Sequence, residues 1–325
     1  MKNNGNSGHP RVGLALGGGG ARGLAQIGVL KVLVRENIPI DLITGTSMGS
    51  VLGGTYAFFG DAQKLEEVCL EYFPKIPQLE GMGNFRRLPQ SQKDTFSRVF
   101  NFLKKLYILK MGTSRIALID NKVIKDLLDE VFKEYTFADL KVPFTAVATD
   151  LRNGEEVLIQ HGQLVPALLA SSAIPGIFEP VELNGRLLVD GNVTSQVPVL
   201  ASRRLGADMV IAVNVEANIK DGKFRNGMEI LFHVDDLRAA ELNRIKLLEA
   251  DVIINPMIGH LNWANFSKIK DCIRAGEIAT ELVLPKIRKR LDQLTPKFWE
   301  KIFKPMSKRE AKYPATLHKI SFLRQ

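Results

Sequence analysis

Closely spaced glycines constrain this chain more than any other feature of its sequence. Four of them, Gly17 to Gly20, directly follow the apolar stretch Val12 to Leu16. Each glycine costs conformational entropy on folding, so four in succession indicate a loop whose backbone itself is needed. A second pattern follows, Gly45-Thr46-Ser47-Met48-Gly49. Its small residues two positions either side of the serine are typical of a tight turn between a strand and a helix.

The serine pattern has the flanking segments that such a turn requires. Ile40-Asp41-Leu42-Ile43 predicts a short buried strand, and the small-residue segment Ser50 to Phe59 predicts a helix. Ser47 then falls at the N-terminus of that helix, where developing negative charge is favoured. The pattern predicts an exposed nucleophilic serine with Gly45 and Gly49 leaving room for the backbone. The alternative is a plain glycine-rich turn.

The first glycine loop fits two functions. Its backbone N–H groups could bind an oxyanion. It also fits the spacing of a dinucleotide-binding loop, Gly-x-Gly-x-x-Gly over residues 18–23, with Asp41 about 20 residues further on. The oxyanion interpretation is favoured, because the serine turn follows Asp41 and because Arg22 is unusual in a turn that must approach a pyrophosphate. The predicted oxyanion donors are Gly18, Gly19 and Gly20.

A nucleophilic serine needs a base, and the candidate is a carboxylate. The histidines, none of which has a convincing setting for this role, are His9, His161, His233, His260 and His318. The segment Gly185 to Asn192 predicts a tight turn, a short apolar strand and then Asp190-Gly191. An aspartate fixed at a strand end could reach a neighbouring hydroxyl directly. Without the serine, the Asp-Gly pair would be taken as a turn.

Four sequence blocks resemble one family when they are taken in order. They are Gly18-Gly19-Gly20-Ala21-Arg22-Gly23, Gly45-Thr46-Ser47-Met48-Gly49, Ala170-Ser171-Ser172-Ala173-Ile174-Pro175 and Asp190-Gly191. Together they resemble the marks of bacterial patatin-like phospholipases, and the similarity runs from about residue 11 to about residue 290. The family commonly has Asp-Gly-Gly or Asp-Gly-Ala, whereas Asn192 follows here. This departure leaves the carboxylate in place.

The resemblance implies a lipid acyl hydrolase that acts on phospholipids or lysophospholipids. Ser47 would be the nucleophile and Asp190 the general base and acid of a dyad, with an acyl-serine intermediate. No cluster of side chains has the spacing of metal ligands, so we expect neither a metal nor a cofactor. Supporting roles would fall to Arg22, Gly45, Gly49 and Gly191. The alternatives are a soluble carboxylesterase or thioesterase on the same dyad, and a dinucleotide- or nucleic-acid-binding protein in which Ser47 is structural.

Alternating apolar strands and helical segments predict an α/β fold. We expect a three-layer α/β/α sandwich around a largely parallel sheet, with an antiparallel hairpin near Gly185. The predicted strands lie near residues 12–17, 40–44, 143–149, 155–160, 178–183, 186–190, 209–215 and 251–254. Residues 11–291 would form one catalytic domain between a flexible leader, residues 1–10, and a basic extension, residues 292–325.

Charge is distributed unevenly. Residues 285–325 hold 12 Lys and Arg against 3 Asp and Glu, which equals the net charge of +9 of the whole chain. Residues 81–119 hold eight Lys and Arg against one Asp. Apolar residues between Phe96 and Tyr107 recur at helical spacing, which predicts a lid or a membrane-docking helix, or alternatively a core-facing stripe. The basic C-terminal stretch could bind anionic lipid headgroups or nucleic acid, and the lipid-handling site that the resemblance implies favours the membrane as the partner.

The remaining features indicate a cytoplasmic protein that is peripheral at the inner membrane face. The polar leader has no apolar core, so no signal peptide is expected. Leu42 to Gly60 is uncharged over 19 residues, but its glycines and serine turn favour a buried strand and helix over a membrane span. Cys69 and Cys272 are expected to be buried free thiols in a reducing compartment. The preferred lipid and the oligomeric state stay open.

Overall fold

One mixed β-sheet forms the centre of the computed structural model, which describes residues 9–73, 116–117, 119–216, 224, 227–258, 261 and 265–295. Within them the sheet has eight strands, in the order β5-β6-β3-β2-β1-β7-β8 with β4 paired to β3. The strands are β1 (Val12–Leu16), β2 (Leu42–Thr46), β3 (Phe144–Asp150), β4 (Glu156–Ile159), β5 (Val181–Leu183), β6 (Arg186–Asp190), β7 (Met209–Val213) and β8 (Val252–Ile254).

Five neighbouring strands, β8, β7, β1, β2 and β3, run parallel. Every residue of β1, β2, β3 and β7 is buried, which is the pattern of parallel strands covered on both faces. The remaining strands β4, β5 and β6 are antiparallel to their partners. The β5–β6 hairpin turns at Asn184 and Gly185, both with positive φ, so the predicted hairpin is confirmed.

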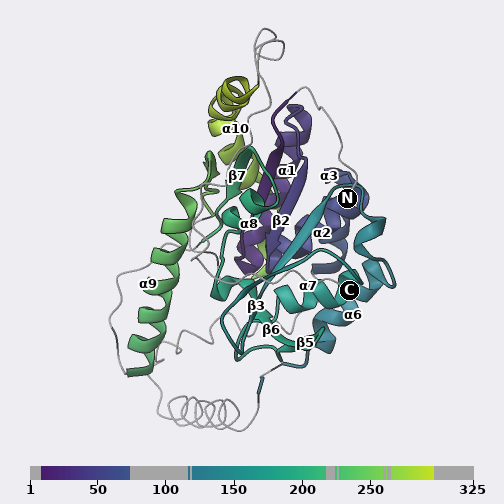
Figure 1. Cartoon of the computed structure of the whole chain (residues 1–325), viewed down its shortest axis with the longest axis vertical. Helices are drawn as coiled ribbons and strands as arrows, with labels where there is room; N and C mark the ends of the chain where they lie inside the picture. The colour runs from purple at the N-terminus through teal and green to yellow at the C-terminus, as the bar shows by residue number, and fades with distance from the viewer. Residues whose placement is uncertain are drawn as a thin grey trace, which may run out of the picture.

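The sheet separates two hydrophobic cores. Leu14, Leu16 and Ile43 face the larger core, whereas their neighbours Ala15 and Leu42 face the smaller one. Helices α1, α2, α7 and α10 cover the larger core, and α8 and the C-terminal end of α9 cover the other face. Figure 1 shows this layered arrangement, with α9 along the outer flank. The predicted three-layer sandwich with a largely parallel sheet is confirmed.

The described helices follow the predicted alternation. They are α1 (Ala25–Arg35), α2 (Met48–Phe59), α3 (Ala62–Tyr72), α6 (Lys122–Phe132), α7 (Leu164–Ser171), α8 (Val199–Arg204), α9 (Gly227–Leu247) and α10 (Ile269–Leu294). Short 3₁₀ helices are η1 (Gly20–Leu24), η3 (Phe137–Asp139), η4 (Gly191–Val193) and η5 (Phe266–Lys268).

Several sequence predictions concern segments that the structure does not describe. Residues 1–8, nearly all of the basic stretch 81–119, and the extension beyond residue 295 lie outside the described residues. The division into leader, catalytic domain and extension therefore stays a prediction. Among the helices described, none combines the length and the apolar character needed to cross a bilayer. The uncharged segment Leu42 to Gly60 is divided between β2 and α2.

The pairing of β3 brings two distant strand ends together. On one edge of β3, Thr46 of β2 lies opposite Val147, and Asp190 of β6 lies opposite the next residue, Ala148. Strand β4 occupies the other edge of β3 at these positions, so β6 continues the edge where β2 stops. Because β6 is antiparallel to β3, the carboxyl ends of β2 and β6 meet head to head.

Candidate active site

Ser47 occupies a strained turn between β2 and α2. Its φ of 54° and ψ of −125° are unusual for a residue with a side chain, and such strain is found at functional sites. The flanking glycines allow the turn. A Cβ on Gly45 would lie 2.4 Å from the carbonyl oxygen of Gly49, and a Cβ on Gly49 would lie 2.2 Å from that of Leu16. Any larger residue at these two positions would displace the backbone that holds Ser47.

The turn is held by the third sequence block. The Ser47 N–H donates to both the carbonyl oxygen and the hydroxyl of Ser171, each at 3.1 Å. The Ser171 hydroxyl in turn donates to the carbonyl oxygen of Val147 at 2.6 Å. The hydroxyl of Ser50 donates to the Ser47 carbonyl oxygen at 2.7 Å. Ser171 therefore connects the turn to the central strand β3.

Asp190 lies at the end of β6 and is hydrogen-bonded to Ser47. Its carboxylate accepts the Ser47 hydroxyl, and its Oδ1 accepts the Asn192 N–H at 2.8 Å. Burial raises the pKa of Asp190 to about 6, against the lowering effect of these two hydrogen bonds. Only 2% of Asp190 and 7% of Ser47 are exposed. Asn192 contributes its backbone, so the departure from the family pattern preserves the contact.

The glycine loop lies against the same turn. A Cβ on Gly18 would lie 3.1 Å from the Cβ of Ser47, so the loop passes close beside the Ser47 side chain. The Gly18 N–H already donates to the carbonyl oxygen of Gln196 at 2.9 Å. Gly19 and Gly20 begin the 3₁₀ helix η1, and the first N–H groups of a helix have no partner within it. Among the described residues, no backbone carbonyl accepts from either of them.

Arg22 ties this loop to the segment after β7. Its Nε donates to the carbonyl oxygen of Val215 at 3.1 Å. The Val215 side chain fills the space beside Gly19, where a Cβ would lie 2.7 Å from it. Gln26 holds the start of the loop, because its Nε2 donates to the Gly17 carbonyl oxygen at 2.7 Å. These contacts fit a supporting role for Arg22 in which it orders the loop, and no sequence motif marked Gln26 or Val215.

Comparison with known proteins decides the family. A model described as patatin-like phospholipase matches residues 14–202, a span that contains all four sequence blocks. The chain belongs to the patatin-like phospholipase family. The family description names phospholipases, and some relatives of this patatin-like chain carry the name lysophospholipase.

This chain spans only part of the length of the relatives that it matches. An uncharacterized NTE family protein from Mycobacterium tuberculosis is 34% identical over 212 residues, which are 65% of this chain and 51% of the relative. The lysophospholipase NTE1 of Saccharomyces cerevisiae is 26% identical over 282 residues, or 85% of this chain and 14% of the relative. The crystal structure of VipD from Legionella pneumophila aligns with 87% of this chain and 67% of VipD, at 14% identity and a TM-score of 0.48.

The segment after Asp190 connects all parts of the site in this patatin-like chain. The Thr46 hydroxyl, next to the nucleophile, donates to the Ser195 carbonyl oxygen at 2.8 Å. Lys246 of α9 donates to the Thr194 carbonyl oxygen at 2.6 Å and pairs with Glu156 at 3.3 Å. With the Gly18 N–H bound to residue 196, this segment links β2, β6, α9 and the glycine loop. Sequence reasoning missed it, since these contacts follow no local pattern.

Other candidate groups lie apart from this constellation. The described histidines are His9, which contacts Pro10, His161, and His233, which packs on the Phe224 ring. The Asp190 carboxylate accepts hydrogen bonds from Ser47 and Asn192. Both cysteines are buried, and burial raises the pKa of each thiol, which makes them poor nucleophiles. Within the described residues, no group of three or more His, Cys, Asp or Glu side chains could hold a metal ion.

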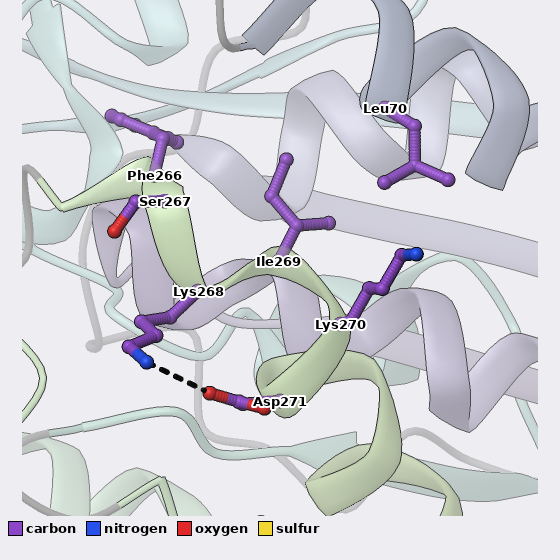
Figure 2. Close-up of a pocket in the computed structure, with 7 residues that line it drawn as sticks. All are labelled: Leu70, Phe266, Ser267, Lys268, Ile269, Lys270 and Asp271. Carbon is purple, nitrogen blue, oxygen red and sulfur yellow. Dashed lines mark ion pairs between the residues drawn. The ribbon is translucent and has the colours of Figure 1, made fainter.

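A separate hollow of about 480 Å³ lies between α3 and the start of α10. Figure 2 shows Leu70 facing it from α3, with Phe266 and Ile269 on the other wall and the Lys268–Asp271 ion pair of 3.5 Å at its rim. None of the predicted site residues lines this hollow. The hollow is therefore separate from the contact between Ser47 and Asp190.

Proposed function

We propose that the chain is a serine lipid acyl hydrolase that cleaves carboxylic ester bonds of phospholipids or lysophospholipids through a Ser47–Asp190 dyad. One observation carries this proposal. The hydroxyl on the strained turn donates to a buried carboxylate whose pKa is raised to about 6. Such a carboxylate is ionised at neutral pH and is a stronger base than an ordinary aspartate.

The contacts support a two-step mechanism. Asp190 accepts the proton of Ser47 as Oγ attacks the acyl carbonyl, and then returns that proton to the departing alcohol. Water attacks the acyl-Ser47 ester, giving its proton to Asp190, which restores it to Ser47 as the fatty acid leaves. The N–H groups of Gly19 and Gly20 are the oxyanion donors, because the Gly18 N–H is bound to Gln196. Removal of one such donor typically costs about 100- to 1000-fold in rate.

The lipid substrate is inferred from family and charge. Several relatives carry the name lysophospholipase. The basic stretches 81–119 and 285–325 add an attraction to anionic membrane surfaces, where such substrates reside. We therefore place the enzyme at the cytoplasmic face of a membrane as a peripheral protein that needs neither metal nor cofactor, with a catalytic domain over residues 11–291 and a basic extension over residues 292–325.

Purified wild type and Ser47→Ala should be incubated with mixed phospholipid and lysophospholipid vesicles, and released fatty acids measured by mass spectrometry. Release by wild type and its loss in Ser47→Ala are expected, with the exposed Ser267→Ala variant as an active control. A fluorophosphonate should label wild type and spare Ser47→Ala. Cleavage of short soluble esters without lipid products would indicate a carboxylesterase or thioesterase on the same dyad. Absence of labelling and of hydrolysis would overturn the proposal.

A further inference from the structure

Helix α9 attaches to the body by one side and leaves the other exposed. Asn243 is buried and donates to Asn214 and Glu216 at 3.2 and 2.8 Å, and Leu247 packs into the smaller core. Lys246 is bound to the segment after Asp190. These contacts fix the rotation of the helix about its axis. Figure 1 shows α9 as the outermost helix on its side of the molecule.

The outward side of α9 carries a regular apolar seam. Its exposed positions, taken through the residue that follows the helix, are Leu231, Val234, Arg238, Glu241, Ile245 and Leu248. The steps between them alternate between three and four residues, which is the spacing of a coiled-coil seam. Leu231 is 63% exposed and Leu248 is 72% exposed. A helix face that only meets water would not be expected to carry four large apolar side chains in one line.

The two ends of this seam are complementary to each other. We propose that α9 pairs antiparallel with α9 of a second copy of this chain, so that Leu231 meets the partner's Leu248 and Val234 meets the partner's Ile245. The same register sets Arg238 opposite the partner's Glu241. Each pairing occurs twice, because the twofold axis passes between residues 239 and 240, as an isologous interface requires. One α9 therefore supplies both halves of the contact.

The charged pair at the centre of the seam favours the antiparallel arrangement over the parallel one. A parallel arrangement would set Arg238 against the partner's Arg238 and Glu241 against the partner's Glu241, with like charges in contact. Charge also disfavours a lipid surface as the occupant. Residues 227–247 hold three Lys and Arg against four Asp and Glu, which gives no attraction to an anionic membrane.

Charge reversal in the full-length chain tests the pairing. Sedimentation velocity over a wide concentration range should give a dimer for wild type. Arg238→Glu and Glu241→Arg should each weaken dimerisation by about tenfold or more, because each creates two like-charge contacts. The double variant Arg238→Glu/Glu241→Arg should recover it. Lys289→Glu, at an exposed position of α10, is the matched control. Thermal melts of all variants check that each one is folded.

Cross-linking tests the register. Val234→Cys combined with Ile245→Cys should form an intermolecular disulfide under mild oxidation, while either single variant should not, and the native thiols are buried. A wild type that stays monomeric at every concentration would overturn the proposal. Efficient cross-linking of Val234→Cys alone would also overturn it, since that indicates parallel pairing. Vesicle binding lost in Arg238→Glu without any dimer would assign the seam to membranes instead.

Discussion

The Asp190 carboxylate is buried beside hydroxyl and amide donors, and burial has the largest effect on its pKa. The N–H of Asn192 and the hydroxyl of Ser47 stabilise the charged form, yet the pKa of Asp190 is raised to about 6. Against the ordinary value of 3.8, this difference corresponds to about 3 kcal/mol, since one pKa unit is 1.36 kcal/mol. The protein bears this cost at neutral pH, and in the proposed mechanism it gains a base able to take the proton of a serine.

The first prediction concerns the pH dependence of hydrolysis. Asp190 must be ionised to act as a base, so kcat/KM should fall about tenfold per pH unit below pH about 6 and level off above it. A soluble short-chain ester makes this measurable without vesicles, and thermal melts at each pH exclude unfolding as the cause. A profile centred near pH 4 would contradict the raised pKa of Asp190.

Replacement of Asp190 by asparagine should separate activity from stability. Because the folded pKa of Asp190 lies above its unfolded value, its stabilising contribution is present at low pH and is lost as pH rises from about 4 through 6. Asp190→Asn removes the buried charge, so it should abolish hydrolysis and raise the free energy of unfolding at pH 7.5 by up to about 3 kcal/mol.

Denaturant unfolding of wild type and Asp190→Asn at pH 7.5 and at pH 4 measures this difference. The gain should shrink at pH 4, where the wild-type carboxyl is mostly protonated. His233→Ala serves as the control and should keep hydrolysis within a few-fold. An Asp190→Asn protein that is less stable than wild type at pH 7.5 would contradict the assigned cost, and loss of activity in His233→Ala would contradict the dyad.

At the scale of elements, the close crossing of α1 and α10 depends on two glycines. A Cβ on Gly276 would lie 1.8 Å from the carbonyl oxygen of Ala25, and a Cβ on Gly28 would lie 2.0 Å from that of Ile273. Both contacts are to backbone, which cannot move aside as a flexible side chain can. Helix α1 begins directly after the glycine loop, so this crossing also supports the site.

Gly276→Ala is therefore expected to destabilise the protein although alanine favours helices. Helix propensity alone would give a gain of about 1 kcal/mol, whereas forcing the helices apart costs about 1–3 kcal/mol or more. Calorimetry should show a lower Tm for Gly276→Ala. Gly227→Ala is the matched control, because a Cβ at Gly227 meets nothing within 4 Å. An unchanged or higher Tm for Gly276→Ala would show that the helices separate at little cost.

Local patterns predicted the elements of the fold but not the contacts between them. Buried apolar runs such as Met209–Val213 predicted the parallel strands, and the Asn184–Gly185 turn predicted the hairpin, because both depend on neighbouring residues. The head-to-head meeting of Thr46 and Asp190 depends on the pairing of both β2 and β6 with β3, which no periodicity encodes. The pairing of Ser47 with Asp190 was predicted from the family resemblance.

The same limit applies within the site. The glycine spacing predicted a loop of backbone donors, yet the capture of the Gly18 N–H by Gln196 could not be read from the sequence. Ser171 was quoted only as part of a motif, and its hydrogen bonds to the Ser47 turn emerged from the structure. The spacing of the α9 seam is present in the sequence, but its exposure depends on which side of the helix meets the body.

At the scale of the whole molecule, the excess of basic residues lies at the C-terminal end of the chain. Residues 1–284 hold as many acidic as basic groups, and the basic residues of 285–325 account for the net charge of +9. Residues 81–119 contribute +7 to that zero sum, so the rest of residues 1–284, which contains all the described strands, carries a net charge of −7. The attraction of the enzyme to an anionic surface would then depend on its C-terminal residues, apart from the contribution of the stretch 81–119.

Neutralisation of these C-terminal charges should lower hydrolysis at membranes and leave the chemistry intact. Residues 296–325 contain eight Lys and Arg, and each basic group near an anionic surface contributes about 1 kcal/mol. Replacing all eight by glutamine should reduce fatty acid release from anionic vesicles by at least about tenfold and weaken its salt dependence. Zwitterionic vesicles and a soluble ester are the controls, on which both proteins should be equal. An equal loss on the soluble ester would mean that these residues support the catalytic domain and do not recruit it to the membrane.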